Sequence, residues 1–582
     1  MKYTVSYAPH HQHFIDIKMT VKVFDKKTRV QCPAWRPGRY EIGNFSANVR
    51  GWKALNEKGE LLKFRKLTKD LWEVETAKCK ELYVLYSYYA AELNAGSTYL
   101  DDRQLYMNPV NCCMYVPELR NEAISMELTL PSEYRIATSM KMDAPKQVLS
   151  NCLHILSAAN YDELADSPLV ASPTLQHETI QVDKLKVNIW FQGEVKPSWS
   201  KIKNDFFIFI REQVQMMESS PVEEYHFIYQ ALPYKFHHGV EHLASTIIAI
   251  GPSYNLMKYE QFNSLLGVSC HEFFHSWNIK SIRPVEMFPY DYTKENYSRL
   301  GYVYEGVTDY YGDYLLLRSG VYSEFDYLKA VQEHLQKHFD NYGRFNLSVA
   351  DSSFDTWVDG YIQSAPYRKV SIYTEGALLA FIVDMFIRNH TANAKSLDDV
   401  MRTLYHNYAM QGKPYSEADY WNIIEKTSGK SCKHIFDKYV DQAADFDTPL
   451  AEAMLYIGLM MQPSPSKRHC ERYWGMKVTE EDSKCKVTAV VPGSPAEIAG
   501  ICVNDEIVLL NEHSLKNNFH DWCAYYGKEQ VKMALISQNF RRYVTVKAED
   551  GAEFFPSYFV VKNRNATPDQ KAAYKAWCHH DF

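Results

Sequence analysis

The feature that most constrains this chain is the pentapeptide His271-Glu272-Phe273-Phe274-His275. On a helix, two histidines four residues apart project from one face, so both imidazoles can bind a single metal ion. The glutamate after the first histidine then lies beside the metal, where its carboxylate can accept a proton from a water molecule. A helix with two histidines and no metal is the other interpretation of so short a motif. The apolar run from Leu265 to Cys270 favours a partly buried helix, in which zinc is the simplest partner for these side chains.

A catalytic zinc site needs a third protein ligand and keeps one position open. Two glutamates downstream of the motif are candidates, Glu295 and Glu305. Glu295 lies in a polar, loop-like stretch, whereas Glu305 lies in the segment from Tyr304 to Tyr314, which can open a helix. Because a ligand on a helix is held more rigidly than one on a loop, we favour Glu305. Asp309 follows one helical turn later and can orient a histidine ligand, although a solvated charge is the alternative interpretation.

The overall composition excludes several classes of protein. A chain of 582 residues is too long for one ordinary core and indicates roughly two to four domains. The net charge of −7, without a basic stripe, argues against a nucleic-acid partner. No apolar run is long enough to span a bilayer.

The N-terminus and the cysteines bear on localisation. The first residues contain no apolar core of signal-peptide length, and the 12 scattered cysteines form no C-x-x-C pair. We therefore expect a cytoplasmic protein with reduced thiols. An exported chain whose signal had been removed would read the same.

Residues 1–170 carry short runs of alternating apolar and polar residues, such as Phe14 to Val21 and Glu81 to Tyr86. Turn signals such as Arg36-Pro37-Gly38 separate these runs, and helical periodicity is nearly absent. We therefore expect an N-terminal β-sandwich-like domain.

Residues 171–458 have a different pattern. A strand is expected at Val187 to Phe191, a long amphipathic helix at Trp199 to Met217, and helical spacing again at Tyr373 to Arg388. This pattern predicts a mainly helical domain around the histidine motif.

The C-terminal part begins at a polar, proline-containing stretch, Gln462 to Ser466, which indicates a linker. A second β-rich segment follows, and we place this domain at residues 459–561. The final stretch, residues 562–582, is polar with poor periodicity, which suits a C-terminal tail or a docked helix. The whole chain is therefore expected to be a multidomain α+β protein.

The run His271 to Pro284, HEFFHSWNIKSIRP, together with Glu305 to Tyr311, resembles the glycyl aminopeptidase family. Two further elements match in the family's order. Cys32 to Tyr40 resembles its N-terminal W-x-P-G-x-Y element, and the segment from Gly493 to Gly500 resembles a bacterial-type PDZ domain. These gluzincins, related to aminopeptidase N, carry an N-terminal β domain, a thermolysin-like catalytic domain and a C-terminal PDZ domain. The resemblance covers nearly the whole chain and implies the same architecture here.

The resemblance also implies roles for particular residues. It supports one zinc ion held by His271, His275 and Glu305, with Glu272 as the general base. The carboxylate would take a proton from the attacking water and pass it to the leaving amine.

Two substrate-contacting elements are implied as well. His238 to His242 resembles the family's G-x-x-E-H element, whose glutamate binds the substrate α-amine in aminopeptidase N, and this assigns Glu241 and Gly239 to substrate binding. Ser371 to Ala377 resembles the Y-x-K-G element, so Tyr373 is expected to donate a hydrogen bond to the developing oxyanion. Glu375 stands where relatives usually have lysine, which puts any role of that lysine in doubt.

The PDZ-like segment departs further from its pattern. The usual Gly-Asp pair is Asn504-Asp505, and the carboxylate-binding loop is expected near Tyr473 to Met476. A peptide C-terminus that adds a strand to this domain is the partner that a PDZ domain implies.

These elements predict a zinc-dependent aminopeptidase that removes one residue from peptides with a free N-terminus. A preference for glycine or alanine is implied by the family. The first alternative is a zinc endopeptidase that captures substrates through its PDZ domain. The second is a non-catalytic interaction protein built around an inactive peptidase fold.

Overall fold

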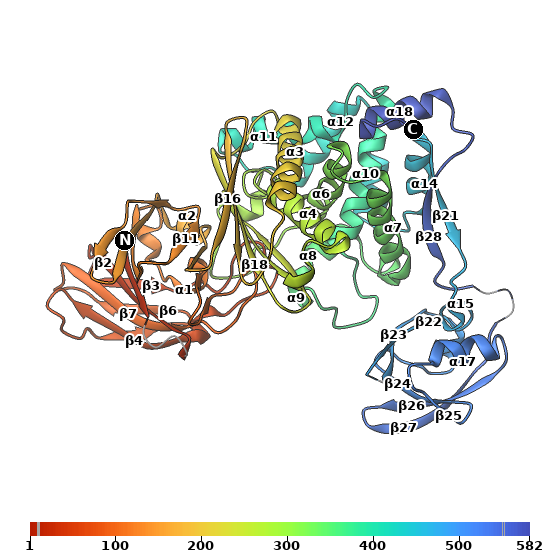
Figure 1. The fold of residues 1–582 in the computed structure, drawn as a ribbon, viewed down its shortest axis with the longest axis horizontal. Coiled ribbons are helices and arrows are strands. Elements are labelled where there is room, and N and C mark those ends of the chain that lie inside the picture. The colour runs from red at the N-terminus through yellow and green to blue at the C-terminus, as the bar shows by residue number, and fades with distance from the viewer. Residues whose placement is uncertain (8–11, 483, 550, 552) are drawn as a thin grey trace.

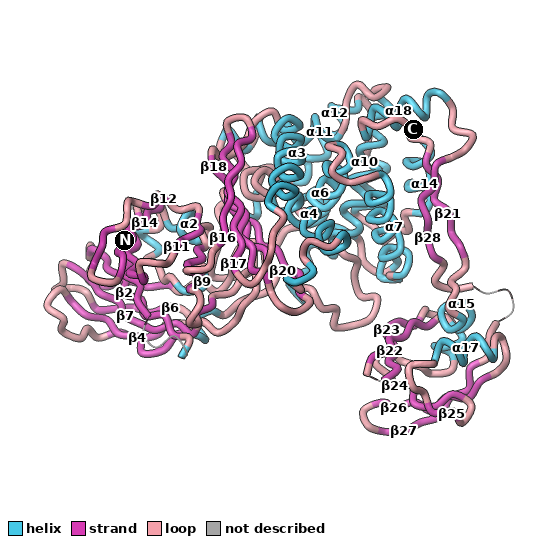
Figure 2. The backbone as a smooth tube through the Cα atoms, viewed as in Figure 1, coloured by secondary structure: helices cyan, strands magenta, loops and turns pink. Residues whose placement is uncertain are grey.

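The computed structural model describes residues 1–7, 12–482, 484–549, 551 and 553–582. A β-rich region comes first, a mainly helical region follows, and a smaller β-rich region hangs from the far end of the helices (Figure 1). Figure 2 shows the same division by secondary structure. The mixed, multidomain architecture expected from the sequence is confirmed. Within the described residues, no helix combines the length and apolar character needed to cross a membrane.

The N-terminal region is built from sheets whose strands alternate buried and half-buried residues, as in β2 and β7. The largest of them follows the order β12-β14-β10-β1-β2-β7-β4, with β13 paired to β14. Its strands are β1 (Lys2–Tyr7), β2 (Phe14–Lys22), β4 (Val49–Asn56), β7 (Glu81–Tyr89), β10 (Ile124–Pro131), β12 (Lys141–Met142), β13 (Lys146–Val148) and β14 (Asn151–Ala158). The smaller sheets contain β3 (Lys27–Gln31), β5 (Phe64–Lys66), β6 (Leu71–Glu75), β8 (Tyr99–Leu100), β9 (Leu105–Met107), β11 (Arg135–Thr138) and β15 (Leu169–Ser172). Short helices α1 (Pro109–Cys112) and α2 (Tyr161–Ala165) lie in this region.

A mixed sheet joins the N-terminal region to the helices, with strand order β16-β17-β18-β20-β19. Its strands are β16 (Gln176–Val182), β17 (Leu185–Gln192), β18 (Glu224–Ala231), β19 (Phe236–Glu241) and β20 (Ser245–Gly251). The three inner strands β17, β18 and β20 run parallel and are almost entirely buried, as strands covered on both faces must be. Strand β19 runs antiparallel to β20 at one edge of the sheet. One side of β19 is therefore free to pair with another chain.

The helices pack against this sheet and against one another (Figure 1). Their bounds are α3 (Trp199–Met217), α4 (Tyr259–Phe274), α5 (Gly301–Tyr304), α6 (Gly306–Arg318), α7 (Glu324–Asp340), α8 (Val349–Phe354), α9 (Thr356–Asp359), α10 (Ile372–His390), α11 (Leu397–Asn407), α12 (Glu417–Ser428), α13 (Lys433–Ile435) and α14 (Asp447–Tyr456). The expected strand at Val187 to Phe191 and the helices at Trp199 to Met217 and Tyr373 to Arg388 are confirmed. Helix α6 contacts α4 and α10 most extensively and forms the centre of this layer.

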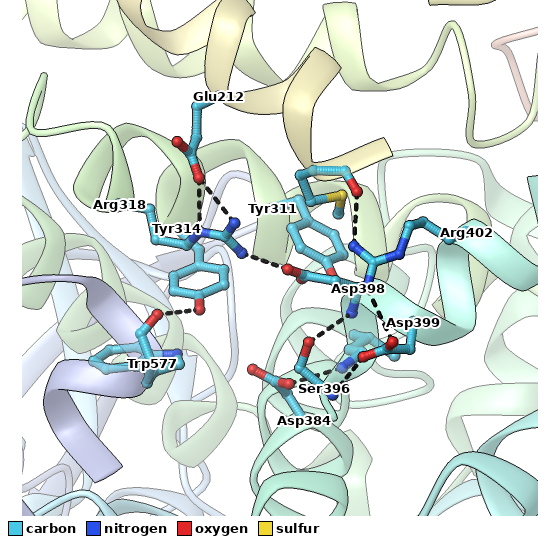
Figure 3. Close-up of polar contacts among 12 residues, drawn as sticks. Glu212, Tyr311, Tyr314, Arg318, Asp384, Ser396, Asp398, Asp399, Arg402 and Trp577 are labelled. Atoms are coloured by element: carbon cyan, nitrogen blue, oxygen red, sulfur yellow. Dashed lines mark hydrogen bonds and ion pairs between the residues drawn. The ribbon is translucent and has the colours of Figure 1, made fainter. Parts of the chain in front are cut away.

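A buried polar network fixes α6 against its neighbours (Figure 3). The guanidinium of Arg318 donates to Glu212 of α3 at 3.0 Å and to Asp398 of α11 at 2.7 Å. The hydroxyl of Tyr311 donates to the second oxygen of Asp398 at 2.8 Å. Burial alone would raise the pKa of Asp398, but Arg318 and Arg388 outweigh it and hold that pKa below its usual value. The network therefore sets the position of the helix whose other end reaches the histidine motif.

The C-terminal β region has its own apolar core, separate from the core that the first two regions share. Its sheet has the order β22-β23-β24-β26-β27, with β25 paired to β24. The elements are β22 (Met476–Glu481), β23 (Lys484–Val490), β24 (Glu506–Leu510), β25 (His513–Ser514), β26 (Val531–Ser537), β27 (Phe540–Val546), α15 (His469–Trp474), α16 (Pro495–Ile498) and α17 (Phe519–Tyr526).

The connections to this last region differ from the sequence prediction. The stretch expected to be a linker begins instead inside strand β21 (Leu459–Ser464), which pairs along its whole length with β28 (Ser557–Lys562). Proline is tolerated there because this ribbon has only these two strands, so an amide can face outward without a partner. After β28 the chain forms α18 (Pro568–Cys578), which starts with a capping box at Thr567. Of the two readings of residues 562–582, the docked helix is the one that the structure shows.

Helix α18 returns to the helical region. The ring of Trp577 stacks on Tyr314 of α6 with centroids 5.4 Å apart, and the hydroxyl of Tyr314 donates to the carbonyl of Trp577. Figure 3 shows this contact beside the Arg318 network. The chain therefore leaves the helical region on β21, builds the C-terminal β region, and returns on β28 to finish the helical core.

Candidate metal and peptide site

The histidine motif lies at the C-terminal end of α4. His271 is in the last turn of the helix, and His275 is its C-cap, with its amide hydrogen-bonded to the carbonyl of His271. The helix is buried on the side of Leu265, Leu266 and Cys270, which anchors the motif in the core. The two Nε2 atoms lie 3.1 Å apart, as expected for histidines one turn apart on one helical face.

Glu305 completes a group of converging ligand atoms. It lies between the short helix α5 and helix α6, and its amide is hydrogen-bonded to the carbonyl of Gly301. Its Oε2 is 3.4 Å from Nε2 of His275 and 3.8 Å from Nε2 of His271. The alternative candidate, Glu295, belongs to neither of the two groups in the described residues whose ligand atoms lie within 4.8 Å of one another.

Each of these three side chains has a further polar neighbour that orients it. Nδ1 of His275 donates to the carbonyl of Asn278 at 2.9 Å, which leaves a lone pair on Nε2. Nδ1 of His271 faces Asp309 at 3.5 Å, where the sequence predicted an orienting carboxylate. The other oxygen of Glu305 accepts a hydrogen bond from the hydroxyl of Tyr40. Partners of this kind fix the tautomer and the angle of a metal ligand.

The donor set fits a divalent metal ion that accepts nitrogen and oxygen ligands. Two imidazole lone pairs and a carboxylate converge within 4 Å of one another in a buried position, where their mutual repulsion calls for a cation between them. The local field favours positive charge: burial would lower the pKa of His275, but Glu305 outweighs it and raises that pKa to about 9. Two histidines and a carboxylate with one side open form the usual ligand set of a catalytic zinc site.

Glu272 lies beside these ligands with its carboxylate largely unpaired. Its Oε2 is buried and has no hydrogen-bond partner among the described residues. Burial raises the pKa of Glu272 to about 7, against the opposing effect of His271 and His275. A buried carboxylate without a partner is costly, so this oxygen is placed for a ligand or a water molecule.

The edge strand β19 forms the opposite wall. A Cβ at Gly239 would lie 2.0 Å from Oε1 of Glu272, so only glycine lets the strand approach the carboxylate this closely. Glu241 ends the strand and is buried, and its carboxylate forms a second close group with Glu272 and His275. Strand and helix thus bring two carboxylates and the ligand group to one place.

Tyr373 enters from the first turn of α10. Its ring centroid is 6.5 Å from that of His271. Burial, and after it the negative charge of Glu305, raises the pKa of Tyr373 well above its usual range. The hydroxyl of Tyr373 therefore stays protonated and can donate a hydrogen bond. The eight site residues expected from the sequence all line a single cavity of about 510 Å³: Gly239, Glu241, His271, Glu272, His275, Glu305, Asp309 and Tyr373.

One wall of this cavity was not anticipated. The loop after β3 belongs to the N-terminal region, yet Ala34 and Trp35 donate their amides to the carbonyl of Tyr292 in the helical region. These two backbone hydrogen bonds hold the loop where Tyr40 contacts Glu305 and Gly38 contacts Glu241.

Gly38 lines the cavity beside Glu241. Its φ is +79°, and a Cβ there would lie 2.4 Å from the Glu241 carboxylate. Arg36 is buried behind it, with its Nε lacking a hydrogen-bond partner in the described residues. The quoted segment Cys32 to Tyr40 contained this signal, but its spacing gave no reason to connect it with residues far along the chain.

Models of known protein families match separate regions of this chain. The Peptidase M61 N-terminal domain matches residues 2–173, and the M61 glycyl aminopeptidase domain matches residues 264–379, which contain the ligand group and Tyr373. The chain belongs to the M61 glycyl aminopeptidase family. A PDZ domain matches residues 465–524 of this M61 chain. No curated protein matches it.

Two solved structures resemble this M61 chain in fold. An aminopeptidase N family protein from Idiomarina loihiensis is 24% identical, with a TM-score of 0.91 over 99% of each chain. An M1 zinc metallopeptidase from Deinococcus radiodurans, solved as a mutant with a Tyr-Ser-Ala substrate bound, is 11% identical. That match covers 76% of this chain and 94% of the other, with a TM-score of 0.50. The match to the M1 enzyme therefore leaves out part of the M61 chain but spans most of the M1 enzyme.

The PDZ domain of this M61 chain differs from the expected pattern at its ligand loop. Tyr473 and Trp474 belong to helix α15, and Gly475 is its C-cap at φ +68°. The side chain of Trp474 is fully buried in the PDZ core. The expected carboxylate-binding loop is therefore the end of a helix, and β22 after it is an edge strand of the sheet.

Proposed function

We propose that this M61 protein is a zinc-dependent aminopeptidase, which hydrolyses the first peptide bond of peptides with a free N-terminus. One observation carries the proposal: the buried Glu241 carboxylate shares a cavity with the ligand group and Glu272, and Gly38 packs against that carboxylate. A carboxylate held this close to the ligand group suits a terminal ammonium one residue away from the scissile bond.

In this proposal His271, His275 and Glu305 hold one zinc ion. The ion, when bound, supplies Lewis-acid activation of water and of the substrate carbonyl. Asp309, the Asn278 carbonyl and Tyr40 hold the three ligands in place. Thermolysin-like organisation of this region is part of the same proposal.

The remaining steps belong to side chains of the cleft. Glu272 takes a proton from the attacking water on its unpaired oxygen and returns it to the leaving amine. Tyr373 donates its hydroxyl to the oxyanion that develops on the scissile carbonyl. Glu241 binds the substrate ammonium, and Gly239 lets the substrate backbone approach β19 without displacing Glu272.

Preference for a small first residue, glycine or alanine, is the finer part of the proposal. The side chain of that residue would point to the end of the cavity where Gly38, Glu241 and Tyr361 meet. The hydroxyl of Tyr361 reaches the carbonyl of Gly38 at 3.4 Å and narrows this end. A larger side chain would have to displace the loop or the Glu241 carboxylate.

The test compares one peptide with a free and with an acetylated N-terminus, with zinc present and after chelation. Cleavage of the free peptide alone, lost on chelation and restored by zinc, is the expected result. Equal cleavage of both forms would remove the role of Glu241 and favour the endopeptidase alternative. Hydrolysis rates on a series of aminoacyl-naphthylamides then measure the preference for the first side chain. Glu241→Gln is the variant that should lose discrimination between the free and the acetylated peptide.

A further inference from the structure

A second cavity of about 740 Å³ adjoins the cleft. The two cavities share one wall, formed by His237, Gly267, Val268, Asp309, Asp313 and Tyr373. The cleft therefore continues into a larger space on the side of this wall, which does not include Glu241. A peptide that begins at Glu241 can extend into that space.

Strand β19 gives that direction. It runs from Phe236 to Glu241, so His237 lies at the end that faces the second cavity and Glu241 at the other end. A substrate whose ammonium binds Glu241 places its first carbonyl at the ligand group, and its second residue then lies against the shared wall. This step rests on the proposed aminopeptidase function.

The shared wall offers an apolar surface and a carboxylate. Val268 lies one turn before His271 on α4 and presents an aliphatic side chain next to the ligand group. Asp313 lies on α6 opposite Gly267, where a Cβ would be 3.1 Å from the hydroxyl of Tyr322 and 3.7 Å from Oδ1 of Asp313. Glycine at this position thus leaves room beside Val268 in front of these two groups.

Asp313 has no assigned partner within the protein. It is partly buried, and no hydrogen bond or ion pair of its carboxylate is found among the described residues. Burial, with Asp309 adding to it, raises the pKa of Asp313 to about 7. Lys337 lines the adjoining cavity and opposes this rise in pKa, but no ion pair between Lys337 and Asp313 is found in the part of the chain that the structure describes. A partly buried carboxylate without a partner gains most from a cationic ligand.

We propose that the shared wall is the subsite for the second residue of the substrate, and that Asp313 makes it selective for lysine or arginine. The aliphatic stem of such a side chain packs on Val268 across Gly267, and its charged group pairs with Asp313. Asp313 is thus a specificity-determining residue on the leaving-group side, separate from the residues that bind the amine and the metal.

Cleavage is measured on matched peptides with a free N-terminus, Ala-Lys-Ala-Ala, Ala-Gln-Ala-Ala and Ala-Glu-Ala-Ala. We expect kcat/KM for the lysine peptide to exceed that for the glutamine peptide about tenfold, the effect of one charge-assisted hydrogen bond. In Asp313→Asn this ratio should fall to near one. Glu260→Gln is the matched control, because it removes a carboxylate from the adjoining cavity that is not part of the shared wall.

Binding without turnover separates this proposal from the proposed function. Calorimetry measures the affinity of Ala-Lys-Ala-Ala and Ala-Gln-Ala-Ala for the zinc-loaded full chain carrying Glu272→Gln, which lacks the proposed base, and every variant compared is made in this background. The lysine peptide should bind about tenfold more tightly to the parent protein and to Glu260→Gln, but not to Asp313→Asn. Equal binding of the two peptides, or a preference that survives in Asp313→Asn, would overturn the subsite. Failure of the aminopeptidase function would instead appear as equal cleavage of free and acetylated peptides.

Discussion

The two walls of the cleft are built in different ways. One wall comes from α4, which carries the histidine motif and Glu272, and from α6, whose N-cap is Glu305 and which carries Asp309. The other comes from the N-terminal loop, where Tyr40 meets Glu305 across 265 residues of sequence. In the proposed mechanism the first wall carries the groups that contact the reacting atoms, and the second contacts Glu305 through Tyr40 and Glu241 through Gly38. Substitutions in the two walls should therefore fail in different ways.

The largest effect is expected on the helical wall. Glu272→Gln keeps the shape of the side chain but cannot accept a proton, so kcat should fall by about 10²- to 10⁴-fold while bound zinc is retained. Steady-state kinetics with metal analysis of the same preparation measure both quantities. Glu295→Gln is the control, since that residue lies outside both ligand groups. Near-normal turnover in Glu272→Gln would remove the proposed base and erase the difference between the walls.

The loop wall is tested next, by Gly38→Ala. Its Cβ would push on the Glu241 carboxylate, and small displacements at a reacting site cost roughly ten- to hundredfold in kcat/KM. Gly59→Ala is a matched control, because Gly59 has the same φ of +79° and nothing within 4 Å of an added Cβ. Both variants carry the same backbone strain, so any further loss of thermal stability in Gly38→Ala reports its contact with Glu241, and only Gly38→Ala should lose activity. Equal activity in the two would show that the loop does not position Glu241.

Tyr40→Phe sharpens the same comparison at a single atom. The ring and its stacking on Tyr304 are kept, and only the hydrogen bond to Glu305 is lost. Loss of such a partner weakens metal affinity by about tenfold or more. Competition with a zinc chelator gives the affinity. Tyr361→Phe, whose hydroxyl does not contact a ligand, should leave it unchanged.

The smallest effect on activity is expected far from both walls, in the network of Figure 3. Asp398→Asn removes one of the two carboxylates paired with Arg318, leaves Glu212 as the other, and should lower stability by about 2 kcal/mol at neutral pH without changing turnover. The pKa of Asp398 is lower in the folded chain than in the unfolded chain, so its contribution is present above the unfolded pKa and disappears as the pH falls. The gap in melting temperature between parent and variant should therefore narrow below about pH 4. A gap that stays constant with pH would show that the charge of Asp398 does not contribute.

These differences follow what could be read from the sequence. The two histidines and Glu272 could be predicted because helical spacing relates them directly to one another, and Glu305 was preferred to Glu295 because its segment can open a helix. Glu241, Gly239 and Tyr373 were reached only through the resemblance, since nothing in their spacing connects β19 and α10 with α4. Their positions in one cavity agree with those expectations, while their roles stay proposals.

The remainder could not be predicted for physical reasons. Tyr40 and Gly38 act through tertiary contacts between regions, which a local pattern does not contain. The proline-containing stretch at Gln462 to Ser466 looked like a linker because composition does not reveal that a two-stranded ribbon accepts proline. The shared wall at Asp313 was missed because an acidic residue on a helix ordinarily indicates a solvated face.

The return of α18 has a consequence for the order in which this chain is completed. Tyr574, Trp577 and Cys578 belong to the core that the first regions share, whereas residues 470–548 contribute a core of their own. Synthesis proceeds from the N-terminus, and a domain folds as a unit once its residues have emerged. On the ribosome, the PDZ domain therefore folds while the helical region still lacks α18, which packs against Tyr314. The last piece of the first core is made after the second core is complete.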